Sequence, residues 1–182
     1  LTAAAVSGIA YSRWGVNHNV LLPPAVDAER RIFNSPRAGR LSYYVDKQGA
    51  GRPLVLIHSI NAAPSAFEVK PLFDYYRGKR PVYALDLPGF GFSDRSERPY
   101  TVELYADAIL DFLRSEVGEA ADVIALSLGC EFASLAAYAR PDLVSSLVLI
   151  SPTGFGFSRN PGRNDVADFQ AVGKRLHKFV TF

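Results

Sequence analysis

The chain has 182 residues, of which 48% are hydrophobic and 21% are charged, and its formal net charge is +2. These values are typical of an ordinary globular protein of about one domain, and the near balance of charge gives no indication of the basic surface that nucleic-acid binding needs. Cys130 is the only cysteine, so an internal disulfide is excluded. We expect no nucleic-acid partner, and we expect Cys130 to be a packed helix residue.

The first ten residues, Leu1 to Ala10, are apolar or small, and Tyr11, Arg13 and Trp14 follow them. Aromatic and basic residues beside an apolar stretch are typical of a membrane interface, but a helix that spans a bilayer needs about 20 residues. Two interpretations stay open: a helix packed on the body of the protein, and the end of a membrane anchor. The chain lacks methionine, so we expect it to have lost its start. Its compartment, cytoplasmic or membrane-associated, stays open.

Between Val16 and Gly39 the sequence is rich in residues that interrupt regular structure. These residues are Asn17, Asn19, Pro23, Pro24, Asn34 and Pro36. We expect this stretch to be a linker arm that leads into the fold, with His18 as a surface residue.

Downstream of this arm, strand-like and helix-like segments alternate. The expected strands are residues 40–46, 54–57, 82–85, 122–126 and 147–150, and the expected helices are residues 64–76, 101–118 and 129–139. Thr101 is a predicted helix cap and Gly118 a predicted helix end. The short apolar runs indicate strands covered on both faces, and the alternation predicts an α/β fold with an open, mostly parallel sheet between helices. Ligands in such folds bind beyond the carboxyl ends of the strands.

One of these strand ends carries a serine between a strand and a helix. Ser127 stands in the sequence Ala125-Leu126-Ser127-Leu128-Gly129. This order is typical of a nucleophile elbow, a sharp turn that lifts the serine hydroxyl above the sheet edge. Small residues are expected two positions before and after the serine, because larger side chains there would meet neighbouring backbone. Ser127 is therefore the candidate nucleophile.

Two further strand ends carry motifs. His58-Ser59-Ile60-Asn61 follows the strand at 54–57, and a turn-rich segment, residues 86–94, follows the strand at 82–85. Together with the elbow, and in this order, these motifs resemble the α/β-hydrolase superfamily. They are most similar to its cap-bearing branch of esterases, haloperoxidase-like enzymes and carbon–carbon hydrolases. The resemblance extends from Leu41 to Thr153.

The resemblance implies a three-layer α/β-hydrolase sandwich that is truncated here before its last strands. It implies three regions: an N-terminal apolar segment and linker arm (1–37), a partial hydrolase core (38–152) and the start of a cap (153–182). It implies no metal and no organic cofactor.

The resemblance also implies roles for the residues of the site. Ser127 matches the nucleophile, and the backbone N–H groups of Leu128 and Ile60 match the two donors of an oxyanion hole. His58 belongs to the same loop, where we expect it to brace the turn rather than to act as a base. Ser59 stands where the family has glycine, a change that restricts φ and is expected to reshape or weaken the oxyanion loop. A turn role is implied for Asp86, Gly89, Gly91 and Ser93.

A serine hydroxyl needs a histidine that accepts its proton and an acid that orients the histidine, and in this family both follow the serine, the acid first. The acids after Ser127 are Glu131, Asp142, Asp165 and Asp168, and the only histidine is His177. His177 lies in a basic, amphipathic segment with no strand before it. We therefore expect the acid and the histidine beyond Phe182 in a longer parent protein, with His177 as the less favoured base.

These observations predict a serine hydrolase that acts on an ester or related acyl bond through an acyl-enzyme at Ser127. Apolar residues at the start of the cap favour a small hydrophobic substrate; they are Phe155, Phe157, Phe169, Leu176 and Phe179. The alternative is a non-catalytic protein of the same fold that binds a small apolar ligand or a partner, which the altered loop at Ser59 and the missing triad residues would favour. For the 182-residue chain alone we expect no activity.

Overall fold

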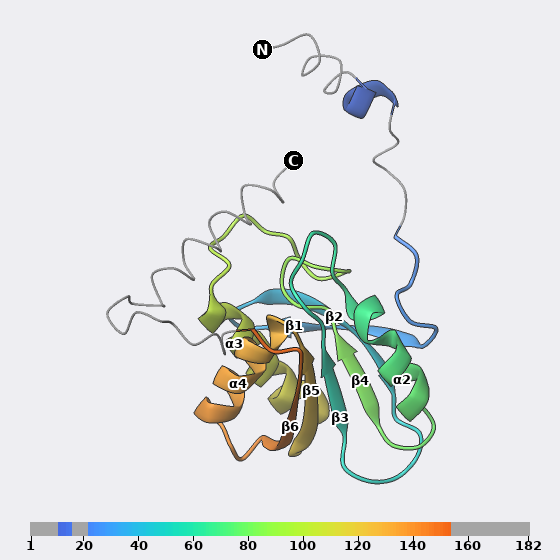
Figure 1. The fold of residues 1–182 in the computed structure, drawn as a ribbon, viewed down its shortest axis with the longest axis vertical. Coiled ribbons are helices and arrows are strands. Elements are labelled where there is room, and N and C mark those ends of the chain that lie inside the picture. The colour runs from blue at the N-terminus through green and yellow to red at the C-terminus, as the bar shows by residue number, and fades with distance from the viewer. Residues whose placement is uncertain (1–10, 16–21, 154–182) are drawn as a thin grey trace, which may run out of the picture.

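The structure, a computed structural model, describes residues 11–15 and 22–153 of the chain. The described part holds a six-stranded sheet in the order β1-β2-β4-β3-β5-β6 (Figure 1). The strands are β1 (Glu29–Ser35), β2 (Gly39–Asp46), β3 (Leu54–Ile57), β4 (Val82–Leu85), β5 (Ala121–Leu126) and β6 (Val144–Ile150). The helical segments are η1 (Tyr11–Gly15), η2 (Ala66–Val69), α2 (Lys70–Tyr76), α3 (Val102–Phe112), η3 (Leu113–Val117) and α4 (Gly129–Ala139).

The sheet is mostly parallel, which confirms the predicted α/β class. Strands β4, β3, β5 and β6 run parallel to one another, whereas β1 and β2 form an antiparallel hairpin and β2 pairs antiparallel with β4. The carboxyl ends of β3, β4, β5 and β6 therefore meet at one edge of the sheet. This edge carries the motifs that the sequence placed at strand ends.

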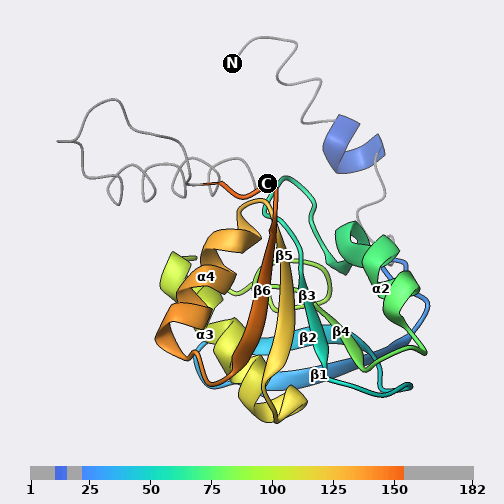
Figure 2. The same ribbon diagram turned by 60° about the horizontal axis from the view of Figure 1, so that its bottom comes forward.

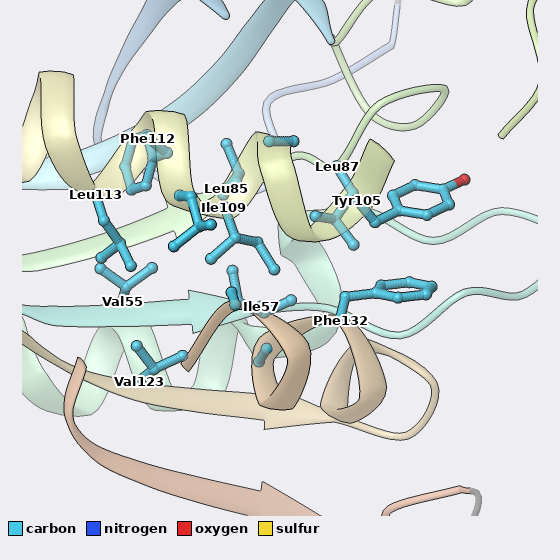
Figure 3. Close-up of a cluster of buried hydrophobic side chains, with 14 of the residues drawn as sticks. Val55, Ile57, Leu85, Leu87, Tyr105, Ile109, Phe112, Leu113, Val123 and Phe132 are labelled. Atoms are coloured by element: carbon cyan, nitrogen blue, oxygen red, sulfur yellow. The ribbon is translucent and has the colours of Figure 1, made fainter. Parts of the chain in front are cut away.

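Helices cover both faces of the sheet. Figure 2 shows α3 and α4 on one side and α2 on the other. Successive side chains of a strand point to opposite faces, and in β3 the side chains of Val55 and Ile57 join the core under α3 and α4, while Leu54 and Leu56 join the core under α2. This double burial explains the uninterrupted apolar run of β3. Figure 3 shows Val55 and Ile57 packed with side chains of α3 and α4, including Ile109 and Phe132.

The continuous helical segment formed by α3 and η3 begins and ends at the residues that the sequence predicted. The side chain of Thr101 accepts a hydrogen bond from the Leu104 amide at 3.2 Å, as an N-cap residue does. Gly118 has φ of 77° and donates its amide to the Leu113 carbonyl, which ends the helical segment η3. Both predicted boundaries are confirmed.

Strand β1 corrects the prediction for the arm. Residues 29–35 were expected to belong to a linker, but they pair with β2 along their whole length. Pro36, Arg37 and Ala38 form the turn of the hairpin, and Gly39 has a positive φ of 80°. The interrupting residues thus reverse the chain instead of leaving it irregular. β1 lies at the sheet edge, and only Phe33 and Ser35 among its residues are buried. It therefore lacks the apolar run that revealed the inner strands.

The N-terminal prediction falls mostly outside the described residues. Leu1 to Ala10 are not described, and Tyr11 and Trp14 are exposed on the short segment η1. Among the helices that the structure describes, none combines the length and apolar character needed to cross a bilayer.

Candidate active site

Ser127 occupies a strained turn between β5 and α4. Its φ is 52°, and only one other non-glycine residue of the described part, Ser151, also has a positive φ. The left-handed region is unfavourable for residues with a Cβ, so such a residue persists only where its surroundings hold it. Here the Ser127 amide donates to the Ile150 carbonyl at 2.9 Å, and the Ser127 carbonyl accepts from the Cys130 amide at 3.0 Å. The turn has the backbone geometry that the sequence predicted for an elbow.

The first residue of α4 must be small because it packs against the neighbouring strand end. A Cβ on Gly129 would overlap the carbonyl oxygen of His58 and would lie 3.2 Å from the Ile57 side chain. The expectation of a small residue two positions after Ser127 therefore has a specific cause. The contact brings the loop after β3 directly against the start of α4.

His58 is buried and has a partner at each ring nitrogen. Its Nε2 accepts a hydrogen bond from the Leu87 amide at 2.9 Å, which leaves Nδ1 as the protonated nitrogen that donates to the Ser59 carbonyl at 2.6 Å. Burial lowers the pKa of the imidazole below its usual 6.5, so the ring is neutral. His58 therefore offers no group to a substrate and joins the loop after β3 to the loop after β4, as expected of a bracing residue.

The segment after β4 wraps around a buried carboxylate. Asp86 accepts hydrogen bonds from the amides of Ala66 at 2.9 Å and Phe92 at 3.1 Å. Gly91 has φ of 52°, and a Cβ on it would overlap the Asp86 carboxyl group. Burial raises the pKa of Asp86, while the two amides lower it. The hydroxyl of Ser93 donates to the Asp86 carbonyl at 2.6 Å, and these contacts fit the structural role expected of this motif.

Ser59 does not need the conformational freedom of glycine, because it is not among the described residues with positive φ. Its amide and its hydroxyl both donate to Oε2 of Glu68, at 2.9 Å and 2.7 Å. Nδ2 of Asn61 donates to the Ser59 hydroxyl at 3.0 Å and also to Oε1 of Glu68. Ser59 therefore offers neither its amide nor its hydroxyl proton to a substrate, and it is bonded to a carboxylate nine residues ahead in the chain.

The two backbone amides predicted as oxyanion donors differ from the amides just before them in having no hydrogen-bond acceptor within the described residues. The amides of Ser59 and Ser127 have acceptors in Glu68 and Ile150. In the described part of the chain, the amides of Ile60 and Leu128 have none. Both residues are half-buried, and both amides belong to the segments that meet at the contact of His58 with Gly129. Their role as donors remains a prediction, which this pattern of free and bonded amides supports.

The described residues place no second histidine near Ser127. Asp165, Asp168 and His177 lie outside them. Of the acids that are described, Glu131 accepts a hydrogen bond from the Thr153 hydroxyl, and Asp142 forms an ion pair with Arg140 beyond the far end of α4. The predicted acid and base therefore remain predictions.

Cys130 is buried and its thiol is hydrogen-bonded to the backbone. Burial raises the pKa of the Cys130 thiol, and its Sγ donates to the Ala125 carbonyl at 3.1 Å, so it is a packed helix residue as expected. Residues 11–15 and 22–153 contain no cluster of three or more His, Cys, Asp or Glu side chains arranged to hold a metal ion.

A cavity of about 230 Å³ lies beside the loops after β3 and β4 and not over the turn at Ser127. Its lining comes from the N-terminal arm and from the loops after β3 and β4, and includes Pro64, Phe90, Phe92 and Arg95. Ser127 and Leu128 do not line it, so it is separate from the candidate reaction centre.

Comparison with known proteins agrees with the fold, and the matched region continues beyond the last described residue, Thr153. A model of the alpha/beta hydrolase family matches residues 54–181. The chain is 32% identical to 2-(acetamidomethylene)succinate hydrolase of Mesorhizobium japonicum over 72% of this chain and 47% of the relative. It is 34% identical to the dihydrolipoyllysine-residue acetyltransferase component of the acetoin cleaving system of Cupriavidus necator, over 65% of this chain and 31% of the relative.

A solved structure shows the same arrangement. The crystal structure of E-2-(acetamidomethylene)succinate hydrolase superposes with a TM-score of 0.56 and 27% identity, over 65% of this chain and 42% of that chain. The chain thus spans about half or less of the length of these relatives. The family model, the relatives, the sheet order and the strained serine turn agree, and the chain belongs to the alpha/beta hydrolase family.

Proposed function

We propose that the protein is a serine hydrolase that cleaves an ester or related acyl bond through an acyl-enzyme at Ser127. The observation that carries the proposal is the left-handed φ of 52° at Ser127, on the turn from β5 to α4. A strained turn of this kind exposes the serine hydroxyl at the carboxyl edge of a parallel sheet, where the α/β hydrolases hold their nucleophile. The hydrolase relative at 32% identity supports the same reaction class.

In this mechanism Oγ of Ser127 attacks the carbonyl carbon of the substrate, and its proton passes to a base. Negative charge then develops on the carbonyl oxygen, where the amides of Leu128 and Ile60 donate to it. Loss of one such donor costs on the order of 3 kcal/mol in the transition state, and the N-terminal end of the α4 dipole adds to the stabilisation. The tetrahedral intermediate then collapses: the carbonyl re-forms, the bond to the leaving group breaks, and that group departs with the proton held by the base, which leaves the acyl group on Ser127. Water then attacks this acyl-enzyme, giving a proton to the base; the bond to Oγ breaks, the carboxylic acid leaves, and the proton returns to the Ser127 hydroxyl. The base and its orienting acid come from outside the described residues.

The proposed substrate is a small hydrophobic ester or acyl compound. Ile60 and Leu128 place half-buried apolar side chains on the two segments that carry the proposed donors. The relative from Cupriavidus necator is named as an acetyltransferase component, so the acyl acceptor needs its own measurement. Hydrolysis and acyl transfer share the acyl-enzyme and differ only in whether water or another nucleophile releases it.

The test uses the complete natural protein and p-nitrophenyl esters of increasing acyl length. Ser127→Ala is expected to lower kcat by at least about 10³-fold, as removal of a triad serine does. Ser134→Ala is the matched control, because Ser134 is a half-buried serine on α4, and it should keep the wild-type rate. An added alcohol would reveal acyl transfer by forming a new ester. Retained turnover in Ser127→Ala would refute the proposal.

A further inference from the structure

The loop that carries the Ile60 amide is fixed from both sides by one carboxylate. Glu68 accepts three hydrogen-bond contacts from Ser59, by its amide and its hydroxyl, and from Asn61, by its side-chain amide. Ser59 and Asn61 are the immediate neighbours of Ile60. The carboxylate therefore holds the residue before and the residue after the proposed oxyanion donor. We call Ser59, Asn61 and Glu68 the loop clamp.

Glu68 itself stands on a firmly held segment. It lies in η2, whose first residue, Ala66, is fully buried and donates its amide to Asp86 at 2.9 Å. The next buried residue of this segment, Val69, packs into the core under α2. Because both ends of η2 are anchored, the position of the Glu68 carboxylate is set by the core rather than by the loop that it holds.

The loop clamp adds a hydrogen bond that glycine could not make at this turn. Ser59 has no positive φ, so the turn does not need a glycine conformation, and the serine side chain adds a bond that glycine lacks. Hydrogen bonds to an ionised acceptor are roughly twice as strong as bonds between neutral groups. The carboxylate cannot stabilise a neighbouring oxyanion, because both carry negative charge. Its effect must therefore come through the geometry of the loop.

We propose that Glu68 is a positioning residue that, through Ser59 and Asn61, holds the Ile60 amide in the orientation that meets the oxyanion. This inference rests on the proposed function of Ser127 and identifies the residue that positions one of its two oxyanion donors. A donor displaced from its productive position loses most of its value, since a misplacement of about 1 Å can cost 10²-fold in rate. The loop clamp thus acts on the transition state and not on the binding of the substrate.

The test compares Glu68→Gln with Asp122→Asn in the complete natural protein. Glutamine keeps the shape of the side chain but turns one accepting oxygen into a donor, so the clamp loses an acceptor for either Ser59 or Asn61. Asp122 is the matched control: it is also a carboxylate with several donors, Arg80 at 2.5 Å and Ser146 at 2.8 Å among them. It lies near the start of β5, at the opposite end of the strands from Ser127.

Glu68→Gln is expected to lower kcat about 10- to 100-fold with KM within about twofold, because an interaction made only in the transition state is lost. The affinity of a boronic acid, which forms a tetrahedral adduct with an active serine, should fall by a similar factor. Asp122→Asn should lower the melting temperature and leave kcat unchanged. Ser59→Ala removes the two hydrogen bonds of the Ser59 hydroxyl, to Glu68 and from Asn61, but keeps the bonds of the Ser59 amide and of the Asn61 side chain to Glu68. We therefore expect a smaller loss of kcat in a variant that folds normally.

The outcomes separate the two proposals. If Ser127→Ala is inactive while Glu68→Gln and Ser59→Ala keep the wild-type kcat and boronate affinity, the positioning role is wrong and the proposed function stands. The positioning role is also wrong if Glu68→Gln only lowers the melting temperature, as Asp122→Asn does. If Ser127→Ala keeps its turnover, the proposed function fails, and the clamp has no oxyanion site to prepare.

Discussion

The carbonyl oxygen of His58 packs against Gly129 so closely that a Cβ on Gly129 would overlap it. His58 is the first residue after β3, and Gly129 is the first residue of α4, immediately after the serine turn. This contact joins the two segments that carry the proposed oxyanion donors. Backbone packing therefore fixes how closely the two segments approach, while the loop clamp orients the Ile60 amide within its own segment.

Gly129→Ala should destabilise the protein, which reverses the usual effect of this substitution. Within a helix, alanine is normally more favourable than glycine by about 1 kcal/mol. Here the added Cβ forces His58 and α4 apart, and overpacking of this kind costs about 1 to 3 kcal/mol. Urea unfolding measures the change, and kcat for an ester should fall with it. Equal or greater stability than wild type would show that the contact can relax.

Gly91→Ala should cost more stability than Gly78→Ala. Both glycines have positive φ, 52° and 73°, so both alanine variants carry the same kind of backbone strain. Only Gly91 has a neighbour that a Cβ would overlap, the buried carboxyl group of Asp86, whereas Gly78 has open space around it. We expect an additional loss of about 1 to 3 kcal/mol in Gly91→Ala, measured by denaturant unfolding of both variants. Equal losses would mean that Asp86 moves aside.

His58 should make the stability of the protein depend on pH below its ordinary pKa. Burial lowers the folded-state pKa of His58 below 6.5, so the unfolded chain binds more protons than the folded protein in this range. The stability is therefore fully present above pH 6.5 and is lost as the pH falls towards the folded-state pKa, by up to about 1.4 kcal/mol per pH unit. Asp86 has the opposite effect: burial raises its pKa above the ordinary 3.8, so its contribution to stability is lost as the pH rises above 3.8.

The contribution of His58 is isolated by comparison with His58→Gln. This variant loses the hydrogen bonds of the imidazole and should be less stable throughout, but its free energy of unfolding should change less between about pH 5 and pH 7. Urea unfolding at several pH values measures both curves. Two parallel curves would mean that His58 does not titrate differently in the folded and unfolded states.

Trp14 should contribute to binding at a membrane surface. Tyr11 and Trp14 are 70% and 82% exposed, and aromatic side chains are enriched at the membrane interface. In the complete protein, Trp14→Ala should weaken sedimentation with phospholipid vesicles, by about tenfold in the partition coefficient if the indole enters the interface. Tyr138 is the matched control because it is an 87% exposed aromatic residue on α4. Equal sedimentation of Trp14→Ala and Tyr138→Ala would contradict this prediction.

The inner part of the fold was predictable because its signals are local. The strand β3 is buried on both faces, so its four residues are all apolar, and Thr101 and Gly118 mark helix ends through bonds to residues a few positions away. The strand β1 was missed because an edge strand with Glu29, Arg30 and Arg31 at its start shows no apolar run. Its strand character comes from pairing with β2, which the sequence of the arm does not encode by itself.

The sequence predicted the backbone turn at Ser127, but it did not predict the hydrogen bonds by which Glu68 holds the neighbouring loop. Ser127 and its small neighbours follow from the local geometry of a sharp turn. The role of Glu68 depends on how η2 folds back on the preceding loop, so nothing in the residues around Ser59 indicated it. The only signal was an acid in the first turn of the segment after the loop, which is also what the helix dipole alone would favour.

The central claim is that Ser127 is an activated nucleophile, and covalent labelling tests it most directly. The complete natural protein would be treated with a fluorophosphonate, which reacts with activated serines, and the modified peptide would be located by mass spectrometry. We expect one phosphonate, attached to Ser127, with no labelling of the Ser127→Ala variant and normal labelling of Ser134→Ala. A protein that stays unlabelled, or that carries the phosphonate on another residue, would contradict the account and favour a binding protein built on the hydrolase fold.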